Sequence, residues 1–147
     1  MFPRGLIIAV VLGIAAGAIV GVLFVTQKNG EQLEYVQGSS ISIVTDKIDF
    51  ELGEHIPIKI INSGTNTLSF SDASYGLKIT GLDGRVLFSP VSAQIISTLD
   101  PKEEISFVWD QIKSDGDQAS SGTYKIISMA HYGDKTIKKS ITINIHK

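Results

Sequence analysis

The sequence predicts an all-β sandwich that follows one transmembrane α-helix, and three observations carry this prediction. Residues 6–25, LIIAVVLGIAAGAIVGVLFV, contain no charged or amide side chain. From residue 41 onward apolar residues alternate with polar ones, which is the pattern of half-buried strands. Turn signals separate these segments, and no helical period follows Tyr35. We therefore divide the chain into a membrane anchor at 1–26, a linker at 27–40 and a β domain at 41–147.

The apolar run is long enough to span a bilayer. Twenty residues at about 1.5 Å each form a helix of roughly 30 Å, the thickness of the hydrocarbon core. A cleavable signal has a shorter run and a small-residue cleavage site, and Thr26-Gln27-Lys28 offers no such site. This favours an uncleaved signal anchor. Arg4-Gly5 resembles the cleavage site of archaeal pilin-like proteins, so processing after Gly5 stays open.

Small residues form one stripe along this helix. Ala9, Gly13, Gly17 and Gly21 recur every four residues, a spacing that lets two membrane helices approach closely. We expect this stripe to contact another membrane helix, from a second copy or from another protein. Arg4 and the α-amine precede the run, so the positive-inside rule predicts a cytoplasmic N-terminus and an extracellular C-terminal domain at the cell membrane. The linker ends in Gly38-Ser39-Ser40, a composition typical of a flexible tether.

The domain begins with alternating segments. Ile41 and Ile43 alternate with hydroxyl residues. Within residues 48–52 and 56–60, apolar residues alternate with other residue types, mostly charged ones. Pro57 lies inside the 56–60 run, so we expect this strand at a sheet edge or a bulge at Pro57. Turn residues fill 62–66, and short strands are predicted at 68–70 and 76–80.

The second half of the domain continues the pattern. Asp83-Gly84 predicts a hairpin into residues 85–88, and residues 91–98 form another extended run. Residues 105–109 alternate again, 114–122 form a polar loop, and 123–132 and 137–145 are two long strands. Seven to nine strands with hairpin turns predict an antiparallel sandwich of immunoglobulin type. The predicted core comprises Phe50, Ile58, Ile60, Leu77, Ile79, Phe107, Trp109, Tyr124, Ile126, Ile141 and Ile143.

Composition excludes several function classes. The chain carries a net charge of −2, which argues against nucleic acid as a partner. It has no cysteine, so it has no thiol nucleophile and no Cys-based metal site. The three histidines, His55, His131 and His146, have no metal-ligand spacing. Asp115-Gly116-Asp117 lacks the glutamate that a calcium loop needs. We therefore expect no cofactor and no bound metal.

No catalytic motif stands out either. Ser71, Asp72 and Ser74 lie far in sequence from any histidine, and no Gly-x-Ser-x-Gly or phosphate-binding glycine loop is present. The sequence therefore favours a protein that is not an enzyme.

Two stretches combine aromatic residues with small polar ones. They are residues 70–76, FSDASYG, and 88–94, FSPVSAQ, a composition suited to recognition loops. We therefore predict Phe70, Tyr75 and Phe88 as contacts for an external protein partner. The alternative is that these aromatics are core residues flanking turns.

A resemblance covers roughly residues 48–145. It rests on Leu52-Gly53-Glu54, Asn62-Ser63-Gly64, Phe70-Ser71, Tyr75, Leu82-Asp83-Gly84, Leu99-Asp100-Pro101, Trp109-Asp110 and Gly122-Thr123-Tyr124. These motifs resemble the BsuPI family, named for a bacterial intracellular proteinase inhibitor. The resemblance implies an immunoglobulin-like sandwich.

Together these features predict an accessory subunit or surface adaptor in the lipid bilayer, with an external interaction domain. A pilin-like filament or archaellum-associated subunit and a membrane-tethered protease inhibitor are the alternatives.

Overall fold

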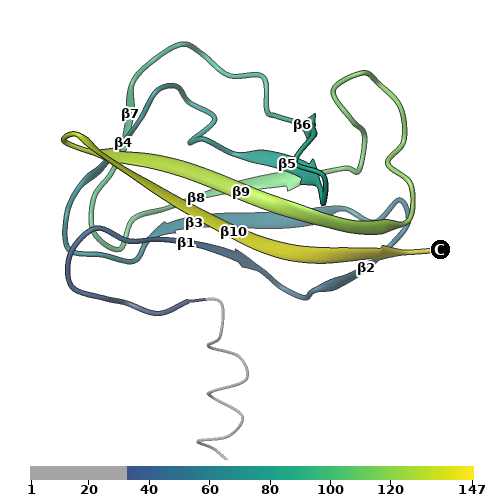
Figure 1. Ribbon diagram of the computed structural model, residues 1–147, viewed down its shortest axis with the longest axis horizontal. Helices are drawn as coiled ribbons and strands as arrows, with labels where there is room; N and C mark the ends of the chain where they lie inside the picture. Colours follow the sequence, from purple (N-terminus) through teal and green to yellow (C-terminus); the bar gives the residue numbers. More distant parts are fainter. Residues whose placement is uncertain (1–32) are drawn as a thin grey trace, which may run out of the picture. The chain divides into compact units, whose positions relative to one another are not determined.

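The computed structural model describes residues 33–147 as an all-β domain (Figure 1), which confirms the predicted class for this part of the chain. Its strands are β1 (Ile41–Thr45), β2 (Asp49–Glu51), β3 (Ile56–Asn62), β4 (Leu68–Phe70), β5 (Lys78–Gly81), β6 (Val86–Phe88), β7 (Ser97–Leu99), β8 (Glu104–Trp109), β9 (Gly122–Tyr132) and β10 (Lys135–His146). These ten strands exceed the predicted seven to nine, and β2, β4, β6 and β7 have only three residues each.

The predicted membrane anchor, with its stripe of Ala9, Gly13, Gly17 and Gly21, lies outside the described residues. Between residues 33 and 147 no helix has the length and apolar character needed to cross a bilayer.

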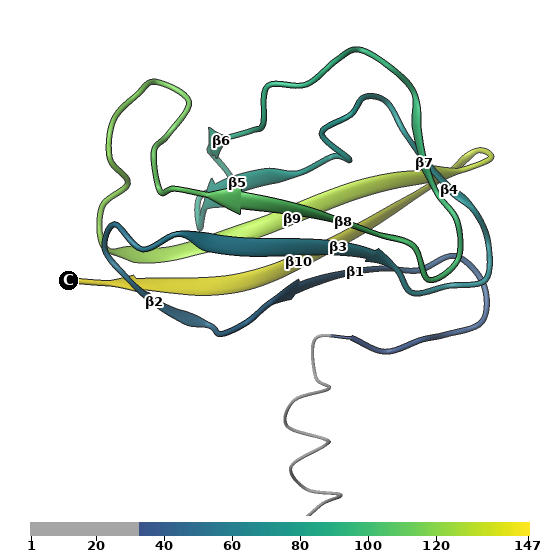
Figure 2. The same ribbon diagram turned by 180° about the vertical axis from the view of Figure 1, so that it is seen from behind.

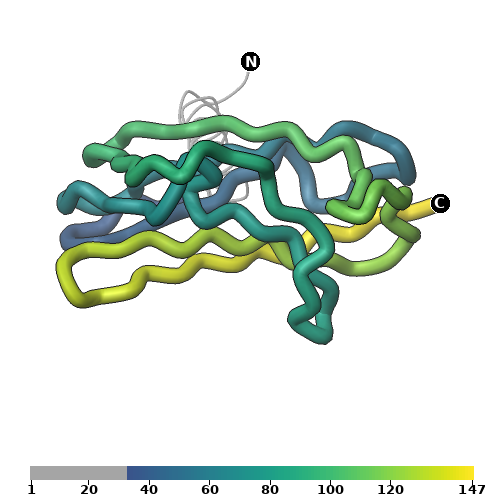
Figure 3. Tube along the Cα trace, turned by 90° about the horizontal axis from the view of Figure 1, so that it is seen from above, coloured from purple at the N-terminus to yellow at the C-terminus, as the bar shows by residue number. Residues whose placement is uncertain are grey.

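The strands form two sheets that enclose one core, as in a β-sandwich. The smaller sheet has the order β1-β3-β8 and faces the viewer in Figure 2. The larger sheet has the order β2-β10-β9-β4-β7, and β5 also pairs with β9 while β6 pairs with β5. All pairs are antiparallel except β2 with β10, which run parallel. Seen from above, the long β9–β10 hairpin runs along one side and β8 along the other (Figure 3).

Alternation along the strands builds the core. Nine of the eleven predicted core residues are buried, while Phe107 and Ile141 are half-buried and pack against them. Trp109 is the largest buried side chain. Its indole N–H donates to the Ile112 carbonyl at 3.0 Å, and its ring lies 5.9 Å from that of Tyr124 in an edge-on arrangement. The polar end of the indole is thus satisfied inside an apolar cluster.

Pro57 lies neither on an edge strand nor at a bulge, so the prediction for this residue is wrong. Its strand, β3, is the central strand of the smaller sheet, and no bulge interrupts its pairing with β8. However, the pairing of β1 with β3 ends at Thr45 and Ile58. Pro57 therefore faces Val108 of β8 on one side and has no β1 residue opposite it on the other side. A proline lacking an amide donor is tolerated there because one side of the strand is locally unpaired.

Residues 38–40, the end of the segment predicted as a flexible tether, are instead bound to the folded domain. Gly38 N–H donates to Thr65 Oγ1 at 2.9 Å, and Thr65 N–H donates to the Gly38 carbonyl at 2.8 Å. Ser63 N–H donates to the Ser40 carbonyl, and Ser63 Oγ lies 2.9 Å from Ser40 Oγ. Serine and glycine indicate flexibility only when their polar groups stay solvated, and here the 62–66 turn binds them.

The extended run at 91–98 is largely a loop rather than a strand. Only residues 97–99 pair, as β7 with β4, while residues 89–96 make no ladder. Pro90 removes an amide donor at the start of this segment.

The outer edge of β9 carries two short strands. β5 pairs with β9 residues 124–127, and β4 pairs with it at His131. The chain between these strands, residues 71–77, therefore crosses the edge of β9 as a loop.

Candidate functional site

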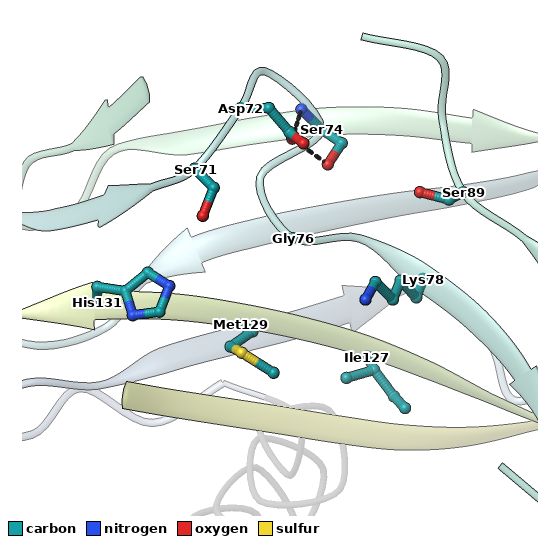
Figure 4. Close-up of a pocket in the computed structure, with 9 residues that line it drawn as sticks. All are labelled: Ser71, Asp72, Ser74, Gly76, Lys78, Ser89, Ile127, Met129 and His131. Atoms are coloured by element: carbon teal, nitrogen blue, oxygen red, sulfur yellow. Dashed lines mark hydrogen bonds between the residues drawn. The ribbon is translucent and has the colours of Figure 1, made fainter. Parts of the chain in front are cut away.

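A pocket of about 220 Å³ lies where the strand beside β9 is interrupted. Its lining, drawn in Figure 4, consists of Ser71, Asp72, Ser74, Gly76, Lys78, Ser89, Ile127, Met129 and His131. Ile126, Ser128 and Ala130 of β9 point into the core, so the residues between them, Ile127 and Met129, face outward and form the floor.

Two left-handed residues set the wall of this pocket. Tyr75 has φ 53° and Gly76 has φ 66°, a conformation that costs a non-glycine residue energy unless its surroundings hold it. The Tyr75 ring is held 5.0 Å from Phe70 and 6.3 Å from Phe107, and its carbonyl accepts from the buried Ser128 hydroxyl at 2.8 Å. Gly76 runs so close to β9 that a Cβ there would lie 2.4 Å from the Met129 carbonyl oxygen.

Asp72 organises the loop that forms one side of the pocket. Its Oδ1 accepts from Ser74 N–H at 2.9 Å and from Ser74 Oγ at 2.5 Å. These bonds from Ser74, with smaller contributions from Ser92 and Lys78, hold the pKa of the Asp72 carboxyl below its ordinary value. The carboxylate is thus ionised, and its Oδ1 points into the turn that residues 72–74 form.

A second loop lies against the first. Ala73 N–H donates to the Ala93 carbonyl at 3.1 Å, and Ser89 Oγ donates to the Leu77 carbonyl at 3.3 Å. We call residues 71–77 and 89–96 together the two-loop surface. The structure therefore brings together the two stretches that the sequence singled out.

The predicted contact residues have different positions. Phe70 is 1% exposed and lies in the core, so its prediction as a partner contact is wrong. The predicted strand at 68–70 is present as β4, and Phe70 at its end points inward although small polar residues follow it. Tyr75 and Phe88 are half-buried: Tyr75 packs on Phe70, and Phe88 lies 6.0 Å from Trp109. The alternative interpretation, core aromatics flanking turns, fits Phe70.

Sequence reasoning missed the exposed aliphatic residues of the two-loop surface. Val91 is fully exposed, Ile95 is 63% exposed and Ile96 is 75% exposed. They were interpreted as part of a strand. The available signal was Pro90, together with two adjacent isoleucines that cannot both face one core.

The pocket also brings a histidine near the serines and the aspartate. His131 and Ser71 line the same space in Figure 4 although sixty positions separate them. Among residues 33–147, no hydrogen bond joins His131 to Asp72 or to a serine of the pocket. The His131 Nδ1 lies 3.5 Å from Thr136 Oγ1 instead. A nucleophile, base and orienting acid in hydrogen-bond sequence, as a triad needs, is not formed by these groups in the described part of the chain.

The other histidines lie elsewhere. His55 is exposed and immediately precedes β3. His146 Nε2 lies 3.0 Å from Asp49 Oδ1, and this contact lowers the pKa of the Asp49 carboxyl. Within residues 33–147 no three metal-ligating side chains come together. Asp115 accepts from Asp117 N–H at 2.9 Å within its own turn.

Comparison with known proteins gives weak similarities only. No protein-family model and no curated protein matches the sequence. The sulfur carrier protein SoxY from Chlorobium limicola f thiosulfatophilum is similar in structure, with a TM-score of 0.44 and 16% identity over 84% of this chain and 93% of that chain. β-Glucosidase from Listeria innocua in complex with glucose gives a TM-score of 0.36 and 9% identity over 74% of this chain and 16% of that chain. Similarities this low transfer no activity, and the resemblance to the BsuPI family stays a prediction.

Proposed function

We propose that the chain is a single-pass membrane protein whose external, non-enzymatic, immunoglobulin-like domain binds another protein through the two-loop surface. The membrane part of this proposal rests on the apolar run at residues 6–25.

The observation that carries the interaction role is the group of exposed aliphatic side chains on residues 89–96. Val91, Ile95 and Ile96 lie within six residues of one another and face solvent. Scattered exposed apolar residues are ordinary, but a local cluster of this kind is typical of protein interaction sites. The loop is held in place against residues 71–77 by the Ala73–Ala93 hydrogen bond, so little ordering is needed on binding.

The immunoglobulin-like assignment is supported by two local features. Trp109 is buried beside Tyr124, and the Tyr124 hydroxyl donates to the Ser120 carbonyl four residues upstream. A tyrosine at the start of a long strand that bonds back to the preceding loop resembles the tyrosine corner of immunoglobulin-like sandwiches.

A role in binding rather than catalysis is favoured by the state of Asp72. Two hydrogen bonds from Ser74 occupy the Oδ1 of this carboxylate. These bonds hold the pKa of the carboxyl below its ordinary value, and a weaker base is less suited to general-base catalysis near neutral pH.

The experiment is site-specific photocrosslinking of the full chain in the membranes of the cell that makes it. A photoreactive amino acid is placed at Ile95 or, as the control, at Val108, which is similarly exposed at 61% but lies on β8 of the other sheet. We expect a crosslinked protein adduct at Ile95 and none at Val108. Failure to crosslink at Ile95, or equal crosslinking at both sites, would contradict the proposal.

A pilin-like filament subunit is the second candidate, favoured by Arg4-Gly5 before the apolar run. Sequencing the N-terminus of the mature protein separates the two functions. A start at Leu6 indicates pilin-type processing, and a start at Met1 indicates a signal anchor.

A further inference from the structure

Lysines from three adjacent strands share the outward face that forms the floor of the pocket, and Lys78 is the one that lines the pocket itself. Lys78 of β5 pairs with Ile127 of β9, and Lys138 of β10 pairs with Met129 of β9. Residues paired across antiparallel strands project to the same face of a sheet, as do alternate residues of one strand. Lys125, two positions before Ile127 on β9, therefore shares this outward face with Lys78 and Lys138. We call these three residues the lysine cluster.

The lysine cluster contrasts with the charge of the rest of the domain. The chain has 13 Lys+Arg and 15 Asp+Glu, and Arg4, Lys28 and Glu31 precede residue 33, which leaves residues 33–147 three charges negative. Within the pocket lining, Asp72 is the one carboxylate. Its Oδ1 is engaged with Ser74, and its interaction with Lys78 contributes less to its lowered pKa than these bonds do.

Two donors that line the pocket make no salt bridge or hydrogen bond among the described residues, although Lys78 interacts electrostatically with Asp72. The Lys78 ammonium forms no salt bridge within residues 33–147, where the ion pairs join other residues. No hydrogen bond to the Ser71 hydroxyl occurs in the same part of the chain. A cation and a hydroxyl with free donors are suited to an acceptor that carries negative charge.

The shape of the pocket limits the occupant. Its volume of about 220 Å³ is below the roughly 300–1,000 Å³ of pockets that enclose drug-sized ligands. It can take one side chain or a chain end. Its floor of Ile127 and Met129, and the neighbouring aliphatic residues of the 89–96 loop, favour apolar groups next to the charged one.

We propose that this pocket recognises a carboxylate flanked by aliphatic side chains on the protein partner, with Lys78 as the principal charge contact. The inference rests on the proposed function, because it assigns the chemistry of the partner bound at the two-loop surface. The carboxylate comes from an acidic side chain or from a C-terminus. Tyr75 and Gly76 preorganise the wall, since Phe70, Phe107 and Ser128 already hold them.

The test is an NMR titration of the ¹⁵N-labelled full chain in neutral-detergent micelles. The probes are acetyl-Leu-Glu-Leu-amide for a side-chain carboxylate, acetyl-Leu-Leu with a free C-terminus for a chain end, and acetyl-Leu-Gln-Leu-amide as the neutral match. We expect saturable shifts of the Lys78, Met129 and His131 amides with at least one of the acidic probes and not with the neutral probe. Whichever acidic probe binds identifies the source of the carboxylate.

Two variants that each remove one lysine charge, at different places in the domain, provide the control. Lys78→Gln should weaken binding about tenfold, the value of one lost charge-assisted hydrogen bond. Lys59→Gln removes an exposed lysine from β3 of the other sheet and should leave binding unchanged.

Three outcomes would overturn the inference. These are an absence of saturable shifts, equal binding of the acidic and neutral probes, and equal effects of the two variants. Lys78-dependent binding to vesicles of phosphatidylcholine and phosphatidylserine, with no response to the peptides, would also overturn it in favour of a lipid headgroup. Crosslinking at Ile95 distinguishes the two proposals, because a persisting adduct keeps the interaction role while the carboxylate chemistry fails.

Discussion

Gly76 is the residue at which the pocket wall depends most directly on backbone geometry. Its φ of 66° and its approach to Met129 both exclude a side chain. Gly76→Ala should therefore lower the free energy of unfolding by about 2–3 kcal/mol. Urea unfolding of the full chain in neutral-detergent micelles measures this change.

Gly84 provides the matched control for Gly76. It also has a positive φ, 84°, but a Cβ there would meet no atom within 4 Å. Gly84→Ala should cost only about 1 kcal/mol, because backbone strain is its only penalty. Equal losses for the two variants would show that the contact with Met129 is unimportant.

Asp72 predicts a pH dependence. Because its folded-state pKa is lowered, its contribution to stability is present above the ordinary pKa of an aspartate and is lost as pH falls through the lowered one. Asp72→Asn should reduce the free energy of unfolding by about 1 kcal/mol at neutral pH. The difference from the wild type should shrink as acid protonates the wild-type carboxyl.

Unfolding curves of both proteins at neutral and acidic pH check this prediction. Asp134→Asn, at the exposed tip of the β9–β10 hairpin, is the control and should change stability by less than about 0.5 kcal/mol at either pH. A deficit of Asp72→Asn that stays constant with pH would contradict the assigned role of the charge.

At the scale of elements, the docking of residues 36–40 on the 62–66 turn depends on Gly64. A Cβ on Gly64 would lie 2.1 Å from the Gly38 carbonyl oxygen and 2.7 Å from the Ser40 nitrogen. Gly64→Ala should therefore lift this segment away, since both clashing atoms belong to the backbone. Hydrogen exchange should show lost protection at Val36 and Thr65, whose N–H groups bond across this contact.

The exchange experiment has internal comparisons. The amides of β9 should keep their protection in Gly64→Ala, because their partners lie in β5 and β10. Thr65→Ser keeps the hydroxyl that accepts from Gly38 and should behave as the wild type. Unchanged protection at Thr65 in Gly64→Ala would contradict the prediction.

The sequence predicted what local periodicity determines. Alternation correctly identified Phe50, Ile58 and Ile143 as core residues, because a strand that is buried on one face imposes a period of two. It failed for Phe70, where three residues are too few to set a parity. Alternation says nothing about Gln111, which follows β8 and is fully buried with φ 64°. Its side-chain amide bonds to Gly53, Glu51 and Glu54.

The pocket could be predicted only in part. The two loops were singled out by composition, but their contact with each other and with β9 depends on long-range strand pairing. No local pattern places His131 or Met129 beside residues 71–77, and the left-handed turn at Tyr75 has no signature in the residue itself. Secondary-structure propensity describes single segments, whereas this pocket forms where residues 71–77, the 89–96 loop and β9 meet.

At the scale of the whole molecule, the proposed topology can be tested because the chain has no cysteine. Asp134→Cys introduces a single thiol at the exposed hairpin tip. We expect a membrane-impermeant maleimide to label this variant in intact cells, because the domain is proposed to be extracellular. Gly5→Cys, on the predicted cytoplasmic side, should be labelled only after lysis. The reverse pattern would contradict the topology.

The place of β10 in the larger sheet affects when the domain can fold. β10 is the last of the strands in residues 33–147, yet it lies between β2 and β9. Its final residues pair with β2, almost a hundred positions earlier. The larger sheet therefore cannot close until β10 has left the ribosome, because β10 is the strand that pairs with β2 among residues 33–147. A nascent chain in which β10 has not yet emerged could pair β9 with β4 and β5, but it would hold β2 apart from this sheet.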